Sequence, residues 1–131
     1  MLHPSIFVAN DDQTYVELIK ELLTDAGYPN VMWHVGQGTF HRVRDEQPKL
    51  VLLDINLINP GRGWTTLDAL RLHPKTRHIP IILCSTDMRL IAEKTDLLRE
   101  LDCQTMEKPF ELEMLLEKVA AAIGPPPSTQ T

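Results

Sequence analysis

The chain has 131 residues, which is close to the size of one domain and long enough to bury a hydrophobic core. Hydrophobic residues make up 43% of the sequence and charged residues 24%, which excludes a disordered chain and is ordinary for a globular protein. The net charge of -5 and the lack of a Lys and Arg cluster argue against nucleic acid as a direct ligand.

The segment MLHPSIFVAN lacks the basic and long apolar regions of a signal peptide, and no stretch is long and apolar enough for a membrane span. We therefore expect a cytoplasmic protein with no membrane partner. Cys84 and Cys103 have neither CxxC spacing nor a histidine at ligand spacing, so we expect buried reduced thiols.

Short apolar segments alternate with amphipathic segments along the chain. The short runs are typical of strands buried on both faces, as in a parallel sheet. In chain order we predict a strand at 5–9, a helix at 15–27, a strand at 30–35, a helix at 39–46, a strand at 49–54, a helix at 65–73, a strand at 79–84, a helix at 88–101, a strand at 103–106 and a helix at 111–124. A long loop is expected after Asp54, and it includes Ile58 to Gly63.

Strands that alternate with helices predict right-handed crossovers and a doubly wound, open parallel sheet. Helices on both faces of the sheet would make this a three-layer α/β/α protein. We expect one domain over residues 1–123 and a disordered proline-rich tail or linker over residues 124–131.

Polar residues gather at the predicted carboxyl ends of the strands, where such sheets bind their ligands. Three carboxylates, a hydroxyl and an ammonium would share a small volume there if the first, third, fourth and fifth strands are neighbours. Carboxylates packed so closely repel one another unless a divalent cation lies between them, and oxygen ligands favour Mg²⁺. The residues are Asn10, Asp11, Asp12, Asp54, Ser85, Thr86 and Lys108.

On these residues the sequence resembles the response-regulator receiver domain, the CheY-like phosphoacceptor module of two-component signalling, over residues 5 to about 123. The resemblance implies a flavodoxin-like fold with strand order 2-1-3-4-5 and five helices. It implies a signalling module, not an enzyme, that takes part in its own phosphorylation and autodephosphorylation. The expected partners are a sensor histidine kinase or a phosphotransfer protein, a downstream protein, and a second copy in a homodimer.

The resemblance assigns the phosphoacceptor and the metal ligands. Asp54 in VLLDIN would take the phosphoryl group from a phosphohistidine. Asp11, Asp54 and the backbone carbonyl of Asn56 would hold Mg²⁺ or Mn²⁺, with Asn10 or Asp12 as a further ligand through water. Asn10 stands where the family has an acidic residue, which removes one charge from the metal site. Asp12 is also a candidate cap of the first helix.

The resemblance also assigns the residues that contact the phosphoryl group. Ser85 and Thr86 in IILCST would bind its oxygens, and Lys108 in EKPF would pair with it, so Asp54 and Lys108 would carry the chemistry. Thr105 stands where the family commonly has a Tyr or Phe that moves inward on phosphorylation. A threonine has too little volume for that role.

Two alternatives remain open from the sequence. One is a receiver-like interaction module that does not become phosphorylated, which Asn10, Thr86 and Thr105 favour. The other is a phosphohydrolase of the haloacid dehalogenase type, which also uses an aspartate at the end of a strand. That family needs a second acid two residues later, where this chain has Asn56.

Overall fold

The computed structural model of the chain describes residues 4–10, 12–35, 38–54, 60–85, 88–108 and 110–126. Within these ranges one parallel sheet contains every strand, and each strand overlaps one of the apolar segments that predicted it. The strands are β1 (Phe7–Asn10), β2 (Met32–Val35), β3 (Val51–Asp54), β4 (Ile81–Ser85) and β5 (Gln104–Glu107).

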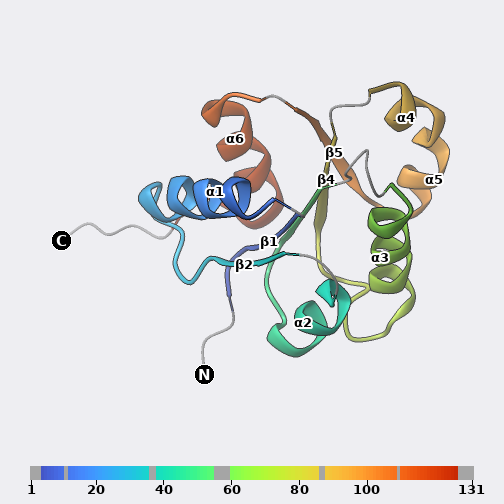
Figure 1. Cartoon of the computed structure of the whole chain (residues 1–131), viewed down its shortest axis with the longest axis horizontal. Coiled ribbons are helices and arrows are strands. Elements are labelled where there is room, and N and C mark those ends of the chain that lie inside the picture. The colour runs from blue at the N-terminus through green and yellow to red at the C-terminus, as the bar shows by residue number, and fades with distance from the viewer. Residues whose placement is uncertain are drawn as a thin grey trace.

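The strand order is β2-β1-β3-β4-β5, which confirms the predicted flavodoxin-like topology (Figure 1). All neighbouring pairs are parallel. Leu53 of β3 is in register with Ala9 of β1, and Asp54 with Cys84 of β4. The carboxyl ends of β1, β3 and β4 therefore lie next to one another.

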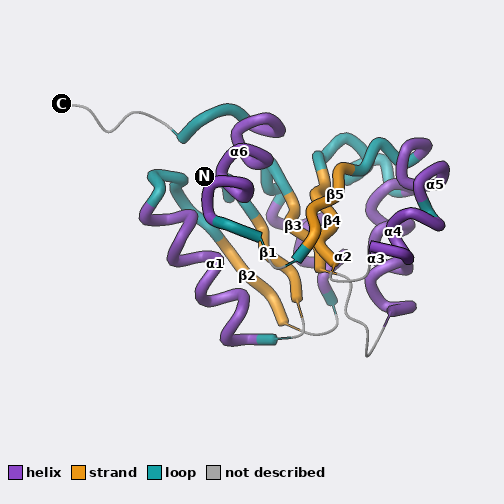
Figure 2. The backbone as a smooth tube through the Cα atoms, turned by 90° about the horizontal axis from the view of Figure 1, so that it is seen from above, coloured by secondary structure: helices purple, strands orange, loops and turns teal. Residues whose placement is uncertain are grey.

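Helices cover both faces of the sheet, so the molecule has three layers. Figures 1 and 2 show α1 and α6 on one face and α2 to α5 on the other. Within the described ranges none of these helices is long and apolar enough to cross a membrane. The helices are α1 (Gln13–Asp25), α2 (Thr39–Glu46), α3 (Pro60–Leu72), α4 (Met88–Glu93), α5 (Thr95–Glu100) and α6 (Leu112–Ile123).

Alternate residues of each strand enter two separate cores, because successive side chains of a strand point to opposite faces. The core under α1 and α6 contains Val8, Leu52, Ile82, Met106 and Leu115. The core under α2 to α5 contains Phe7, Val51, Leu83, Leu67 and Leu98. Burial on both faces explains why β1, β3 and β4 are almost continuously apolar in the sequence, whereas the edge strands β2 and β5 are less buried.

The predicted helix over 88–101 is two short helices, so the described chain has six helices where five were predicted. The break falls at Lys94, which leaves α-helical geometry with φ -103° and ψ 12°. The hydroxyl of Thr95 donates to the carbonyls of Ala92 and Ile91, at 2.9 and 3.3 Å. Such bonding of a threonine to the preceding turn bends helices, and sequence periodicity does not reveal it.

The prediction that Pro60 to Gly63 belong to a loop is wrong, because α3 begins at Pro60. Proline is favourable in the first helical turn, where its missing N–H has no intrahelical acceptor in any case. The two glycines at 61 and 63 suggested a turn, and the rest of the helix overrides their low helix propensity. Residues 55–59 lie outside the described residues.

The chain after α6 folds back over the end of α1. Gly124 has φ +87°, and its carbonyl accepts a hydrogen bond of 2.9 Å from the hydroxyl of Tyr28. Gly27 has φ +108° and lies close to Pro126. A Cβ at position 27 would be 3.1 Å from the Cβ of Pro126, so a larger residue would be crowded there. Residues 124–126 are thus ordered against the domain, and the rest of the predicted tail, 127–131, lies outside the described residues.

Arg71 of α3 joins three segments that are distant in the sequence. Its guanidinium donates to the carbonyl of Leu101 at 2.6 Å, of Ile79 at 2.8 Å and of Arg77 at 3.0 Å. One side chain therefore donates hydrogen bonds to backbone carbonyls at the end of α5 and in the turn before β4. The sequence pattern assigned no role to Arg71.

We expect Arg71→Met to lower the free energy of unfolding by about 2 to 4 kcal/mol, because several charge-assisted hydrogen bonds are lost together. Urea denaturation of both proteins measures the difference. Arg42→Met is the matched control, because the Arg42 to Glu46 ion pair of 3.8 Å is exposed and should contribute less than about 1 kcal/mol. Equal effects of the two substitutions would contradict this role of Arg71.

Candidate functional site

The predicted polar residues meet at the carboxyl edge of the sheet. Asn10, Asp54 and Ser85 are the last residues of β1, β3 and β4, which are neighbours in that order. Lys108 follows the last residue of β5, which pairs with β4. The topology therefore brings together residues that are up to 98 positions apart in the chain.

An ion pair between Asp54 and Lys108 lies at the centre of this edge. Nζ of Lys108 contacts Oδ1 of Asp54, and the side chains are only 16% and 6% exposed, respectively. The backbone N–H of Lys108 donates to the carbonyl of Ser85 at 2.8 Å, which ties the end of β5 to the end of β4. The ion pair and this backbone hydrogen bond together hold Lys108 with its ammonium near the Asp54 carboxylate.

The two faces of the sheet separate the site residues. Asp54 comes two residues after Leu52, and Leu52 belongs to the core under α1 and α6. Ser85 comes two residues after Leu83, which belongs to the core under α2 to α5, and it is completely buried. The period of two along a strand thus puts the carboxylate toward α1 and the serine toward α3 to α5.

Asn10 and Asp12 form the turn between β1 and α1. The side-chain carbonyl of Asn10 accepts from the backbone N–H of Asp12 at 3.3 Å. The carboxylate of Asp12 accepts from the backbone N–H of Tyr15 at 3.2 Å, so Asp12 is the N-cap of α1. The alternative that Asp12 caps the first helix is therefore confirmed.

Tyr15 is a member of the site that the sequence pattern did not reveal. Nζ of Lys108 lies 4.6 Å from the centre of its ring, within cation–π distance. Burial raises the pKa of its hydroxyl well above the ordinary value, and the charges of Cys84 and Asp54 act in the same direction. In the sequence Tyr15 looks like the first core residue of an amphipathic helix. Its place three residues after the N-cap was the available signal.

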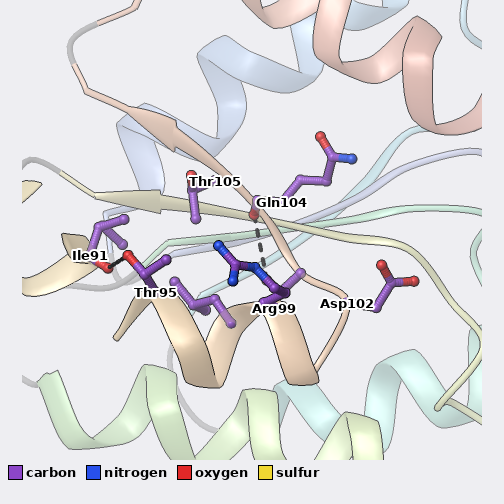
Figure 3. Close-up of a pocket in the computed structure, with 8 residues that line it drawn as sticks. Ile91, Thr95, Arg99, Asp102, Gln104 and Thr105 are labelled. Carbon is purple, nitrogen blue, oxygen red and sulfur yellow. Dashed lines mark hydrogen bonds between the residues drawn. The ribbon is translucent and has the colours of Figure 1, made fainter. Parts of the chain in front are cut away.

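Thr105 lies beside an open cavity of about 320 Å³ between β5 and the helices α4 and α5 (Figure 3). Thr105 is two residues beyond Cys103 and therefore on the same face as Ser85. The short side chain leaves this volume unfilled. The cavity is lined by Ile91, Thr95, Leu98, Arg99, Asp102, Cys103, Gln104 and Thr105.

Both cysteines are free thiols, and the predicted burial is confirmed for Cys84 but is wrong for Cys103. Cys84, next to Asp54 in register, is buried, and burial together with the charge of Asp54 raises its pKa to about 12. Cys103 is partly exposed, and burial raises its pKa to about 11. Neither thiol ionises near neutral pH, so neither adds charge to the site.

Three of the predicted site residues, Asp11, Asn56 and Thr86, lie outside the described residues. Within the described part of the chain, no three His, Cys, Asp or Glu side chains gather in a way that could hold a metal ion. Asn10 and Asp54 are described, and each has a side-chain oxygen. They are the last residues of the neighbouring strands β1 and β3. Oxygen donors of this kind fit a hard cation such as Mg²⁺.

Because the ion pair is shielded from water, removing its cation should leave a costly buried carboxylate. We expect Lys108→Met to lower the free energy of unfolding by about 2 to 4 kcal/mol, and Asp54→Asn in that background to recover part of the loss. Urea denaturation of the two single variants and the double variant measures the coupling.

Lys20→Met is the control for this cycle, because Lys20 is an exposed lysine of α1. Its effect should stay within about 0.5 kcal/mol. Strictly additive effects of Lys108→Met and Asp54→Asn would show that the pair contributes no coupling.

Comparison with known proteins agrees with this geometry. Residues 6–120 match the family model described as the response regulator receiver domain. The polar-differentiation response regulator DivK of Brucella ovis is 24% identical over 123 residues, which cover 92% of this chain and 96% of DivK.

Two solved structures share the fold over most of the chain. The chemotaxis protein CheY4 of Vibrio cholerae has a TM-score of 0.78 at 19% identity and covers 93% of this chain and 100% of its own. The receiver domain of sensor histidine kinase PA1611 from Pseudomonas aeruginosa, solved with a magnesium ion coordinated in its active site cleft, has a TM-score of 0.72 at 16% identity and covers 94% and 99%. The family match over nearly the whole domain, together with the topology, shows that the chain belongs to the response regulator receiver domains, the phosphoacceptor modules of two-component signalling.

Proposed function

We propose that Asp54 is the phosphoacceptor of this receiver domain. The observation that carries the proposal is the buried pairing of the Asp54 carboxylate with the Lys108 ammonium at the carboxyl end of the central strand. Receiver domains take their phosphoryl group from histidine kinases or phosphotransfer proteins, and we propose a phosphohistidine on such a partner as the donor. The family match makes the chain a signalling module.

The residues around Asp54 have complementary roles in this proposal. An oxygen of Asp54 attacks the phosphorus, the phosphorus–nitrogen bond breaks, and its electron pair leaves with the imidazole. The ammonium of Lys108 offsets the negative charge on the phosphoryl oxygens, which is the usual electrostatic contribution in phosphoryl transfer. The hydroxyls of Ser85 and Thr86 donate to the other oxygens.

We propose that Mg²⁺, or Mn²⁺, is bound by Asp11, Asp54 and the backbone carbonyl of Asn56, with Asn10 as a ligand through water. An ion held by these residues would supply positive charge that offsets the charge of the carboxylates and of the incoming phosphoryl group. The magnesium ion in the cleft of the PA1611 receiver domain supports this choice. Asp12 is less suited to the water-mediated position, because its carboxylate caps α1.

Loss of the phosphoryl group by water attack, and thus autodephosphorylation, belongs to the same proposal. A haloacid dehalogenase-type hydrolase is not favoured, because the family match is to receiver domains and Asn56 cannot act as the second acid. The two free thiols support a reducing compartment, and we propose the cytoplasm.

Phosphorylation of Asp54 is expected when the chain is incubated with Mg²⁺ and acetyl phosphate. The intact mass should rise by one phosphoryl group, and chelation of the metal should suppress the rise. Asp54→Asn removes the nucleophile and should abolish it. An unchanged wild-type mass under saturating donor would contradict the proposal and favour an interaction module that is not phosphorylated.

A second expected outcome concerns the surface that responds to phosphorylation. Thr105 cannot fill the cavity beside it, so movement of Ser85 has no bulky partner in β5 to displace. A ligand shifts a conformational equilibrium only through contacts that differ between the two states. We therefore expect beryllofluoride, a phosphoryl mimic, to change amide exchange in residues 85–89 and in the loop after Asp54, and to leave residues 103–106 nearly unchanged.

Thr105→Tyr is the matched variant for this experiment, because its ring can enter the cavity. It should extend the exchange changes to β5 and the start of α6. Asp54→Asn with beryllofluoride should show no change in either region. A large change across residues 103–106 of the wild type would contradict the expected role of Thr105.

A further inference from the structure

Among the described residues, the Lys108 ammonium contacts both a carboxylate and an aromatic ring. Its ammonium pairs with Asp54 and also lies over the face of Tyr15, 4.6 Å from the ring centre. An ammonium in this position is attracted by the negative face of the ring. The two contacts come from different elements, because Asp54 ends β3 and Tyr15 belongs to the first turn of α1.

The ring itself is held in place by local structure. The backbone N–H of Tyr15 is bonded to the carboxylate of Asp12, and the side chain packs against the core under α1 and α6. Tyr15 and Lys108 also line a cavity of about 360 Å³, together with residues of α1 and α6, two helices that lie on the same face of the sheet in Figure 1. The position of the ring next to Lys108 is thus set by the start of α1 and by the core.

The two contacts of Lys108 differ in what happens to them during phosphoryl transfer. The contact with Asp54 must change, because the carboxylate becomes an acyl phosphate and the negative charge moves onto the phosphoryl oxygens. The contact with the ring does not depend on that charge. A lysine side chain carries up to about 2 kcal/mol of rotamer entropy, and a second fixed contact reduces what must be lost when the ammonium reorients.

We propose that Tyr15 is a positioning residue of the phosphoacceptor site. Its ring face holds the ammonium of Lys108 beside Asp54 before transfer. The ring stays in contact with the ammonium while the ammonium turns from the carboxylate to the phosphoryl group. This inference rests on the proposed function of Asp54. It assigns the role to the ring, so phenylalanine should substitute for tyrosine and leucine should not.

The contact is tested by the NMR shift of the Lys108 ε-methylene protons in the full chain without phosphodonor, assigned by their loss in Lys108→Met. A ring face above the side chain moves these protons upfield. The upfield shift should be present in the wild type and in Tyr15→Phe, and it should disappear in Tyr15→Leu. Leu18→Ala is the control, because Leu18 lines the same cavity from an exposed position on α1.

The role is tested by the rate of Asp54 phosphorylation with acetyl phosphate and Mg²⁺. Tyr15→Leu should be slower by about 3- to 30-fold, which corresponds to the roughly 0.7 to 2 kcal/mol of a partly desolvated cation–π pair. Tyr15→Phe and Leu18→Ala should stay within about twofold of the wild type, because both retain the ring face.

Two results would overturn the inference. One is an ordinary Lys108 shift in the wild type, which decides the matter even if Tyr15→Leu fails to fold. The other is a Tyr15→Phe variant as slow as Tyr15→Leu, which would assign the effect to the hydroxyl. A wild-type chain that takes up no phosphate would instead refute the role of Asp54. The NMR shift of Lys108 would then still test the contact between Lys108 and the Tyr15 ring.

Discussion

The buried ion pair of Asp54 and Lys108 is the constraint on which the rest of the site depends. A carboxylate that is 6% exposed is costly unless a cation shares its desolvated volume, and the cation comes from the far end of the domain sequence. Only a sheet that brings the ends of β3, β4 and β5 together can supply it. The bond from the Lys108 N–H to the Ser85 carbonyl then fixes the reach of the ammonium. The strand order is therefore a requirement of the charge balance as well as a packing solution.

The site residues divide between the two sides of the sheet, and the ion pair lies on one of them. Asp54, Lys108 and Tyr15 meet on the side of the sheet under α1, whereas Ser85 and Thr105 belong to the side under α4 and α5. A phosphoryl group at the edge would contact residues from both sides. In the proposed function, charge neutralisation would thus come from one side of the sheet and the conformational response from the other.

The alternation of short, mostly apolar segments with amphipathic ones was sufficient to predict a parallel sheet covered by helices on both faces, whereas the strand order followed from the resemblance to receiver domains. Asp54 and Lys108 were also predictable, since they follow apolar runs that end at the same edge. The break at Lys94 was not predictable, because a local bond from Thr95 causes it within an unbroken apolar period. Tyr15 was missed for a different reason. Tyr15 is the first residue of the predicted helix over 15–27, and only the three-dimensional position of Lys108 shows its contact with the ammonium.

Asn10 changes the electrostatics of this edge in a way that follows from the ion pair. With an amide at the end of β1, the sequence provides two carboxylates at the strand ends, Asp11 and Asp54, in addition to the helix cap. One of the two is already neutralised by Lys108. A third carboxylate would increase both the affinity for a divalent cation and the repulsion in its absence. Compared with an acidic residue at this position, the amide would therefore lower the repulsion in a metal-free site and would also weaken the proposed site for Mg²⁺.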